Sequence, residues 1–444
     1  MPTLTGSFLA RTLTLCALYC AQGMPWGFVT VTLLAYLGER GLTLDDTAGI
    51  ISLATLPWSF KFIWGVVIDR FTFRPMGRRR PWVLLAQLCA GLTLLAMILQ
   101  GDIADDVRLL AWMVFLHNCF VSLQDVASDA LAIDVLKPEE RGRVNGLMWG
   151  SSYLGIAIGG AGMGTVLGRF GIHAAFVLQA GVLLAIALFP LLLRERAGDR
   201  LLPWSRGGSE GSDALPESEG FAVLIGNLWR AFLAKAPVFG LLYGAASFLM
   251  IGISVTINPI FCTQEIGWSQ ERYSQIDGGV SAVAGIVGAL VGGFLVDRLG
   301  VGRLVTVAVL GVVTLCAIMS LSDDLRTNSD FVLFYLPAMA FITSAQTVAG
   351  FSLFMRLCSA VVAGTQFTLF MAATNFARVG GAGVVDALSE SGYPTLFGIM
   401  AVSALAGLPA LYACLATAPP PTTGKSDDEA AGDTPPAAPD LAAG

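Results

Sequence analysis

The sequence has little charge for its length. Only 13% of its 444 residues are Asp, Glu, Lys or Arg, whereas 55% are hydrophobic, and the mean hydropathy is +0.71. Soluble domains carry about 25% charged residues. Because this chain has too few polar residues to cover a water-exposed surface, we expect most of it to lie in a lipid bilayer. No basic domain is present, which excludes nucleic acid as a partner.

Histidine and paired cysteines are scarce as well. The two histidines, His117 and His173, exclude a histidine-rich metal site. The eight cysteines fall mostly within apolar runs and form no Cys-x-x-Cys pair, which favours small buried side chains over disulfides or metal ligands. There is no phosphate-binding loop and no HExxH motif, so direct use of ATP and integral-membrane catalysis are not expected. The sequence predicts no enzyme activity and no cofactor.

Long apolar runs are abundant. A membrane-spanning helix needs about 20 mostly apolar residues, and twelve segments meet this requirement. They are residues 12–37, 47–68, 82–100, 109–136, 144–168, 172–193, 236–261, 273–296, 303–321, 331–356, 363–387 and 394–417. The first run is uncharged and longer than the apolar core of about 7–15 residues in a signal peptide, so it is predicted to be a membrane helix.

Two polar stretches divide the chain. Residues 194–235 are rich in Gly, Ser and Glu and are predicted to be a cytoplasmic linker between the six-helix regions 1–193 and 236–418. Within the linker, residues 221–234 form a candidate amphipathic helix on the membrane surface. Residues 419–444 are polar and proline-rich, so we expect a disordered tail.

The positive charges predict the orientation. If the N-terminus is cytoplasmic, 19 of the 26 Lys and Arg residues lie on the inner side and only 5 lie in outer loops. Cytoplasmic loops are the ones enriched in Lys and Arg. Both termini are therefore predicted to be cytoplasmic.

A short motif recurs in both halves. Gly65-x-x-x-Asp69-Arg70 and Gly293-x-x-x-Asp297-Arg298 are 228 residues apart, each at the inner end of the second helix of its half. Parallel repeats of this kind predict an all-α membrane protein with twelve helices in two pseudo-symmetric six-helix bundles, the major-facilitator fold. The glycine permits close packing, and the charges can hold one conformation shut. A simple positive anchor is the alternative. The residues assigned to gating are Gly65, Asp69, Arg70, Arg78, Gly293, Asp297 and Arg298.

The segment 109–136 carries a polar stripe. Asn118, Ser122, Asp125 and Asp129 have i, i+4, i+7, i+11 spacing and share one helix face. Buried charges cost ~2.5–3.5 kcal/mol each on insertion scales and usually mark function. Two carboxylates one turn apart in a low dielectric favour protonation of one of them, which suits a proton carrier. A polar network that ties helices together is the alternative.

Lys61 lies in segment 47–68 at about the depth of Asp129. We hypothesise an ion pair between Lys61 and either Asp129 or Asp125, and assign proton coupling to these three residues. The alternative is that Lys61 extends to the inner membrane surface.

Other intramembrane polar residues are candidates for the substrate. Tyr19, Gln22 and Trp26 share a face beside a Gly-x-Pro helix break and suit a sugar-like solute, or else an interhelical contact. Arg378 predicts either an anionic substrate group or a buried acid such as Asp277 or Asp386. The predicted substrate-binding residues are Tyr19, Gln22, Trp26, Asn118, Gln124, Asn258, Gln346, Asn375 and Arg378.

Four segments, residues 19–25, 56–80, 124–143 and 356–378, resemble the AmpG-type permeases. This branch of the major facilitator superfamily includes muropeptide and acetyl-coenzyme A transporters. The resemblance implies proton-coupled import across the bacterial inner membrane, with Lys61, Gln124, Asp125 and Asp129 at matching polar positions. The family's best-known cargo is anhydro-muropeptide, and related permeases take up iron-siderophore complexes.

The sequence therefore predicts a secondary active transporter that works by alternating access. A small-molecule substrate, the lipid bilayer and the proton gradient are the expected partners, and a monomer is the expected state. A permease for another solute is the nearest alternative. A membrane sensor acting through the linker and tail is a more distant one.

Overall fold

The computed structural model describes residues 3–71, 73–100, 106–137, 140–205, 233–358 and 363–418. Within these ranges the regular elements are helices, and one isolated β-bridge joins Thr3 to Arg194. The centre of the predicted linker, most of the candidate amphipathic helix 221–234 and the tail 419–444 lie outside the described residues.

The N-terminal helices run from residue 8 to residue 192. They are α1 (Phe8–Gly27), η1 (Phe28–Leu33), α2 (Leu34–Glu39), α3 (Leu44–Ser59), α4 (Phe62–Arg70), η2 (Arg74–Met76), α5 (Arg80–Ile98), α6 (Val107–Val135), α7 (Arg141–Ala157), η5 (Ile158–Gly162) and α8 (Met163–Leu192). Helix α8 covers parts of two predicted helices. Gly171, which has a φ of 82°, bends the chain sharply between these two parts. Only glycine takes this backbone conformation readily.

The C-terminal helices run from residue 235 to residue 417. They are α10 (Lys235–Ile260), η6 (Phe261–Glu265), α11 (Gln270–Gln275), η7 (Ile276–Ser281), α12 (Ala282–Leu299), α13 (Val301–Leu321), α14 (Asp323–Arg326), α15 (Ser329–Leu357), α16 (Ala363–Ala387), η8 (Ser389–Ser391) and α17 (Gly392–Thr417).

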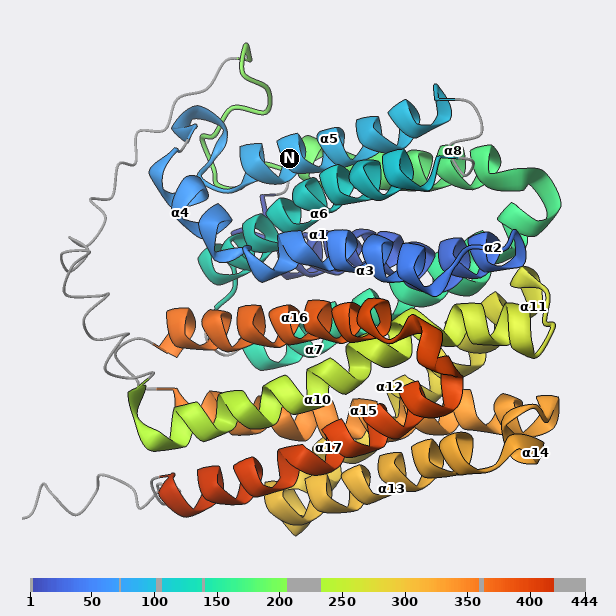
Figure 1. Ribbon diagram of the computed structural model, residues 1–444. Coiled ribbons are helices and arrows are strands. Elements are labelled where there is room, and N and C mark those ends of the chain that lie inside the picture. The colour runs from blue at the N-terminus through green and yellow to red at the C-terminus, as the bar shows by residue number, and fades with distance from the viewer. Residues whose placement is uncertain are drawn as a thin grey trace, which may run out of the picture.

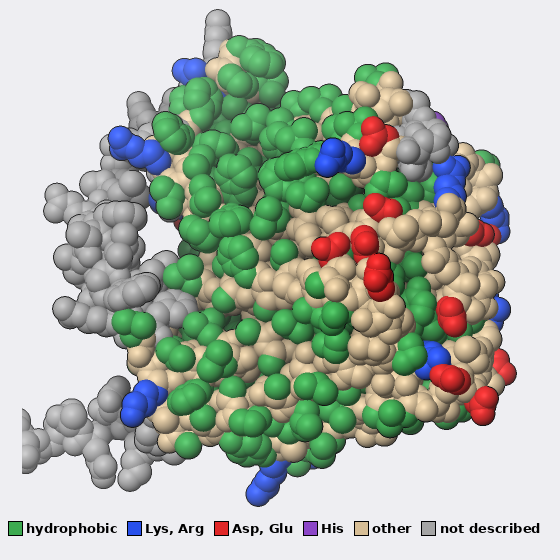
Figure 2. Space-filling model, viewed as in Figure 1, with side chains coloured by type: hydrophobic (Ala, Val, Ile, Leu, Met, Phe, Trp, Pro, Cys, Tyr) green, Lys and Arg blue, Asp and Glu red, His purple; other side chains and the backbone are tan. Residues whose placement is uncertain are grey.

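The helices have the length and composition of membrane spans. Among the described residues, eight are long and apolar enough to cross a bilayer, or nine if the bent pair α3 and α4 is one span. One of the eight stretches, Gly146–Leu192, covers two of the predicted segments. Hydrophobic side chains cover much of the visible surface (Figure 2), and several of them, such as Leu290 and Val402, are more than two-thirds exposed. The chain is a multi-pass membrane protein.

The two sets of helices form two layers. In Figure 1 most of the N-terminal helices, blue to green, lie above the C-terminal helices, yellow to red, and α7 lies next to α16 where the two sets meet. The start of α10 and the end of α17 lie at the same end of the molecule, on the left of the view. We call it the termini end. The opposite end, with α2 and α11, we call the distal end.

Glycines let α1 pack closely against α7 and η5. A Cβ added to Gly23 or Gly27 would overlap the backbone of Ser152 or Ile156, and one added to Gly155 or Gly159 would overlap the backbone of α1. Small residues bring membrane helices together in this way. Helix α1 is therefore held backbone to backbone against its neighbour.

The two halves meet through small residues on the distal side. The backbones of Gly160 in η5 and Gly278 in η7 approach so closely that a Cβ on either glycine would overlap the other. Nearby, Gln264 Nε2 donates to the carbonyl oxygens of Gly38 (2.9 Å) and Leu42 (2.8 Å). Arg169 and Glu271 add a loose ion pair at 3.8 Å. The distal end is thus closed mainly by close packing and by hydrogen bonds from a side-chain amide to backbone carbonyls.

We predict that Gly278→Ala destabilises this closed arrangement. The new Cβ would meet the backbone of Gly160 and Ala161, and such overpacking costs about 1–3 kcal/mol. Gly279→Ala is the matched control, because its Cβ would make an ordinary 3.5 Å contact with Ala161. Thermal unfolding of the purified protein should show a lower Tm for Gly278→Ala only. Equal Tm values for the two variants would refute the close contact.

Candidate functional site

The polar stripe of α6 faces the protein interior, as predicted. Of its four residues, Asn118, Ser122 and Asp125 are at most 3% exposed and Asp129 is half-buried. Gln124, next to Asp125, is 3% exposed. Asn118 Nδ2 donates to the Ala54 carbonyl of α3 at 2.8 Å. Gln124 Nε2 donates to the Leu18 carbonyl of α1 at 3.2 Å. In this conformation, these two predicted substrate ligands hold neighbouring helices together.

Lys61 forms the hypothesised ion pair, and its partner is Asp125. The Nζ–Oδ2 distance is 3.3 Å, and the two side chains are 15% and 5% exposed. Lys61 lies where α3 and α4 meet at a bend of 43°, just after Pro57, and proline is a common cause of such kinks. The bend directs the ammonium into the N-terminal half, so Lys61 does not extend to the membrane surface.

Two residues of α1 complete this group. Gln22 Nε2 donates to Asp125 Oδ1 at 2.6 Å, and the Tyr19 hydroxyl donates to Asp129 Oδ1. Sequence reasoning assigned both to the substrate, but here they bind the two acids. We call Tyr19, Gln22, Lys61, Asp125 and Asp129 the acid cluster. Its members come from α1, the α3–α4 bend and α6.

Arg378 of α16 lies between aromatic rings of both halves. Its guanidinium carbon is 5.2 Å from the Trp26 ring centre and 5.4 Å from that of Phe248, within the range of cation–π attraction. Its Nε has no hydrogen-bond partner, and no described acid is within ion-pair distance. The predicted pairing with Asp277 or Asp386 is therefore wrong.

The reason is the placement of the two acids. Asp386 is eight residues further along α16, about 12 Å at 1.5 Å per residue, and is exposed. Asp277 lies in η7 and accepts a hydrogen bond from the Tyr273 hydroxyl at 3.2 Å. Neither acid is therefore placed to pair with the Arg378 guanidinium.

A cavity of about 150 Å³ lies between the halves. Its polar lining comes from η1, α10, α11, η7 and α15, and consists of Thr30, Ser254, Asn258, Tyr273, Asp277 and Thr343. The predicted substrate residue Asn258 thus does line a cavity. Asn375 lies at the contact between the halves, where its Nδ2 is 3.4 Å from the Trp58 carbonyl oxygen.

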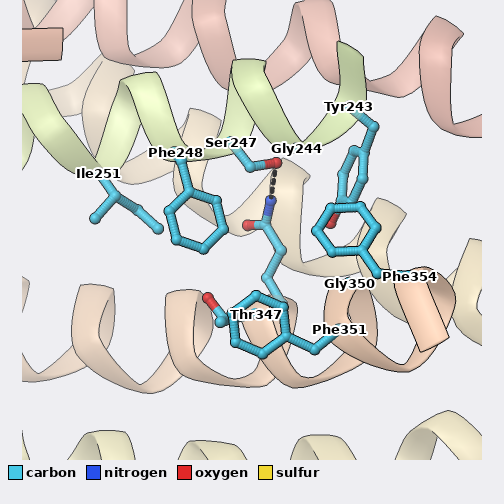
Figure 3. A pocket seen from close by; sticks show the side chains of 10 residues that line it. Tyr243, Gly244, Ser247, Phe248, Ile251, Thr347, Gly350, Phe351 and Phe354 are labelled. Atoms are coloured by element: carbon cyan, nitrogen blue, oxygen red, sulfur yellow. Dashed lines mark hydrogen bonds between the residues drawn. The ribbon is translucent and has the colours of Figure 1, made fainter. Parts of the chain in front are cut away.

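The surroundings of Gln346 are much tighter. Its amide donates to Ser247 Oγ at 3.1 Å, and the rings of Phe248, Phe351 and Phe354 crowd around it (Figure 3). The remaining space is about 10 Å³, room for about one water molecule. Gln346 therefore meets no open substrate cavity in this conformation.

The predicted gating glycines are not closely packed here. A Cβ on Gly65 would meet nothing within 4 Å, and one on Gly293 would only touch Val348 at 3.9 Å. Arg298 stacks on Phe294 of its own helix at 4.2 Å, and Arg70 is exposed. The side chains of Asp69 and Asp297 lie outside the described residues. A role of this motif in another conformation stays a prediction.

Instead, the loop before α5 is held within the N-terminal half. The backbone amides of Arg78, Arg79 and Arg80 donate to the Glu195 carboxylate at 3.2, 3.0 and 3.1 Å, which places an anion at the positive end of α5. Arg79 also pairs with Asp134 at 3.0 Å. The sequence did not reveal this role of Glu195, because the three amides that it binds are more than a hundred residues away along the chain.

Most of the chain matches a known protein family. Residues 15–382 match the model of the Major Facilitator Superfamily. The chain belongs to this superfamily. The family match therefore identifies a membrane transporter rather than an enzyme.

Individual relatives agree with this membership. Over 418 residues, the chain is 27% identical to the anhydromuropeptide permease of Escherichia coli K12, covering 92% of this chain and 80% of the relative. A solved peptide transporter has a TM-score of 0.71 at 14% identity, covering 94% of this chain and 97% of that one. A bacterial homologue of the lysosomal transporter Spinster, solved inward-facing and unoccupied, has a TM-score of 0.65 at 15% identity, with 94% and 100% covered.

At the termini end, we predict a pH-dependent contribution from Arg11 and Glu140. Arg11 Nη2 donates to Glu140 Oε2 at 2.7 Å, and this hydrogen bond lowers the pKa of Glu140 from its usual value of 4.5. The stability it adds is therefore complete above that value and is lost as pH falls through the lowered pKa. The Tm difference between wild type and Glu140→Gln should shrink from pH 7 to pH 3.5. A difference that is constant with pH would contradict the ion pair.

Proposed function

We propose that the protein is a proton-coupled importer of a bulky polar solute, such as an anhydro-muropeptide, in the bacterial inner membrane. The acid cluster is the observation that carries this proposal. Inside the N-terminal half, Asp125 pairs with the single cation Lys61. Asp129, one turn further along α6, accepts a hydrogen bond from the Tyr19 hydroxyl and has no described cation within ion-pair distance. Because an unbalanced buried charge is costly, the cluster favours one bound proton and neutrality. It is therefore suited to take up and release a proton during transport.

Alternating access gives the proton and solute a common path. We propose twelve spans in two six-helix bundles, with cytoplasmic termini as the charge distribution predicts. The distal end is then periplasmic, and its closure makes this conformation inward-facing. The inward-facing structure of the Spinster homologue offers a parallel in the same fold. Opening the Gly160–Gly278 contact would give the outward-facing state.

Helix α1 connects the proton site to the solute site. It carries Tyr19 and Gln22 toward the acids, and one turn further Trp26 lies against Arg378. An anionic group of the solute would bind Arg378, whose charge no described acid balances. A shift of α1 on solute binding would then change the hydrogen bonds that the two acids accept. The cargo itself is suggested by the name of the Escherichia coli relative.

The proposal predicts gradient-driven accumulation in proteoliposomes. With labelled anhydro-muropeptide, a one-unit inward pH gradient should support about tenfold accumulation for one proton per solute. Asp125→Asn and Asp129→Asn each remove one acid of the cluster and should reduce accumulation to the level without a gradient. Asp386→Asn removes an exposed acid of α16 and should behave as wild type.

The outcomes separate coupling from cargo. Accumulation that ignores the gradient in wild type would overturn proton coupling. Failure to take up anhydro-muropeptide, together with gradient-driven uptake of another solute such as a siderophore, would overturn the cargo alone.

Tyr19→Phe should uncouple transport without preventing solute binding. The substitution removes only the hydroxyl that binds Asp129, a hydrogen bond to a charged group worth about 1.5–3 kcal/mol. Gradient-driven accumulation should fall, whereas exchange of labelled for unlabelled solute without a gradient should continue. Tyr412→Phe is the control, because Tyr412 is exposed and binds Thr306 far from the cluster. Equal loss of both activities in Tyr19→Phe would contradict this role and would instead support a substrate-binding role for Tyr19.

A further inference from the structure

The cavity between the halves contains a half-buried acid that the proton-coupling cluster does not use. Asp277 of η7 lines this cavity together with Asn258 of α10. The side chain of Asn258 is 92% buried, since the residue is 8% exposed. Its Nδ2 donates to Ser254 Oγ at 3.0 Å, but its Oδ1 has no partner. A buried acceptor without a donor is costly, so we expect Asn258 Oδ1 to accept a hydrogen bond from a ligand.

The other polar atoms of the lining have mostly used their hydrogens. Ser254 is the exception, because its Oγ accepts from Asn258 Nδ2 and keeps its own hydrogen. Thr30 uses its hydroxyl hydrogen on the Trp26 carbonyl at 2.8 Å, and Thr343 uses its own on the Met339 carbonyl at 2.7 Å. The Tyr273 hydroxyl already donates to Asp277. The cavity therefore presents lone pairs and a carboxylate, and the complementary ligand is rich in hydrogen-bond donors.

The charge of Asp277 is not balanced nearby. Among the described residues it forms no ion pair with Lys or Arg. The titratable groups that face it are Tyr273, Cys262 and Tyr335, none of which is a cation. A carboxylate and an unpaired amide oxygen together match a protonated amine, which has three donors and no acceptor.

We propose that this cavity is a subsite for a protonated amine of the transported solute, bound by Asp277 and Asn258. The inference rests on the proposed transport function and specifies the chemistry of its cargo. A cavity of 150 Å³ has about the volume that holds one benzene molecule in another protein. It therefore admits one arm of a bulky solute, such as a short aminoalkyl chain, and not the whole molecule.

Arg378 supplies the complementary half of the recognition. Thr30 of the cavity lies in η1, which continues α1, and is four residues beyond Trp26, which touches Arg378, a rise of about 6 Å. Along α10, Asn258 is ten residues beyond Phe248, the second ring at Arg378, a rise of about 15 Å. One solute can thus span an anion site and an amine site, which predicts a zwitterionic cargo.

The test measures binding directly, without a proton gradient. Purified full-length protein is heated with n-propylammonium chloride at a fixed ionic strength, with sodium chloride and tetramethylammonium chloride as matched salts. We expect n-propylammonium alone to raise Tm, by about 2 °C at saturating concentration, because tetramethylammonium has no N–H donor. Asp277→Asn and Asn258→Leu should abolish the rise, and Asp386→Asn should retain it.

Three results would overturn the subsite. They are an equal rise with tetramethylammonium, a rise with sodium that depends on Asp277, and a rise with n-propylammonium that survives Asp277→Asn. The first would show a site for any cation, the second an inorganic ion site, and the third binding elsewhere. Absence of any rise in wild type would also reject the proposal.

Uptake separates this inference from the proposed function. An anhydro-muropeptide with a free amine and its N-acetylated form are compared in wild type, Asp277→Asn and Asp386→Asn. Wild type and Asp386→Asn should prefer the free amine about tenfold, and Asp277→Asn should lose the preference. Equal uptake of both forms by wild type would refute the amine subsite while leaving the transporter intact. Uptake of neither form would instead refute the proposed cargo.

Discussion

The structure depends on how charge is balanced inside the membrane. In water, a surface ion pair contributes little, but within a bilayer an unbalanced charge is expensive enough to decide which helices lie together. Lys61 and Asp125 meet because the bend between α3 and α4 directs the lysine inward at the level of the acid. With Asp129 one turn further along α6, the site holds one cation and two acids. We propose that this unequal count lets the cluster bind and release a proton.

The C-terminal half contains two unpaired charges of opposite sign at separate positions. Arg378 is surrounded by aromatic rings that stabilise its charge without neutralising it. Asp277 lies near tyrosines and a cysteine, with no described cation within ion-pair distance. Had Arg378 paired with Asp277, which was one of the alternatives that the sequence left open, the two charges would have balanced each other. Because they are apart, we propose that they form two binding positions of opposite sign.

Sequence reasoning predicted the helices and their buried faces better than their partners. The spacing of Asn118, Ser122 and Asp125 identified the inward face of α6, because a helix period is a local property. The intramembrane position of Lys61 indicated a nearby acid, and Asp125 is that acid. The partners of Tyr19 and Gln22 could not be predicted, since a face shared on one helix does not say which neighbour it meets. Glu195 was missed for the same reason.

Glycine packing explains how such distant sites can act together. Tyr19 and Gln22 bind the acids from α1, and the same helix is held backbone to backbone against α7 and η5 by its glycines. The next glycine, Gly160, contacts Gly278, the residue after Asp277. Contacts between backbones cannot be relaxed by a change of rotamer, so α1 cannot move far without moving η5. In the proposed mechanism, a change of protonation at Asp129 would therefore reach the distal closure, and Asp277 beside it, through these two closely packed helices.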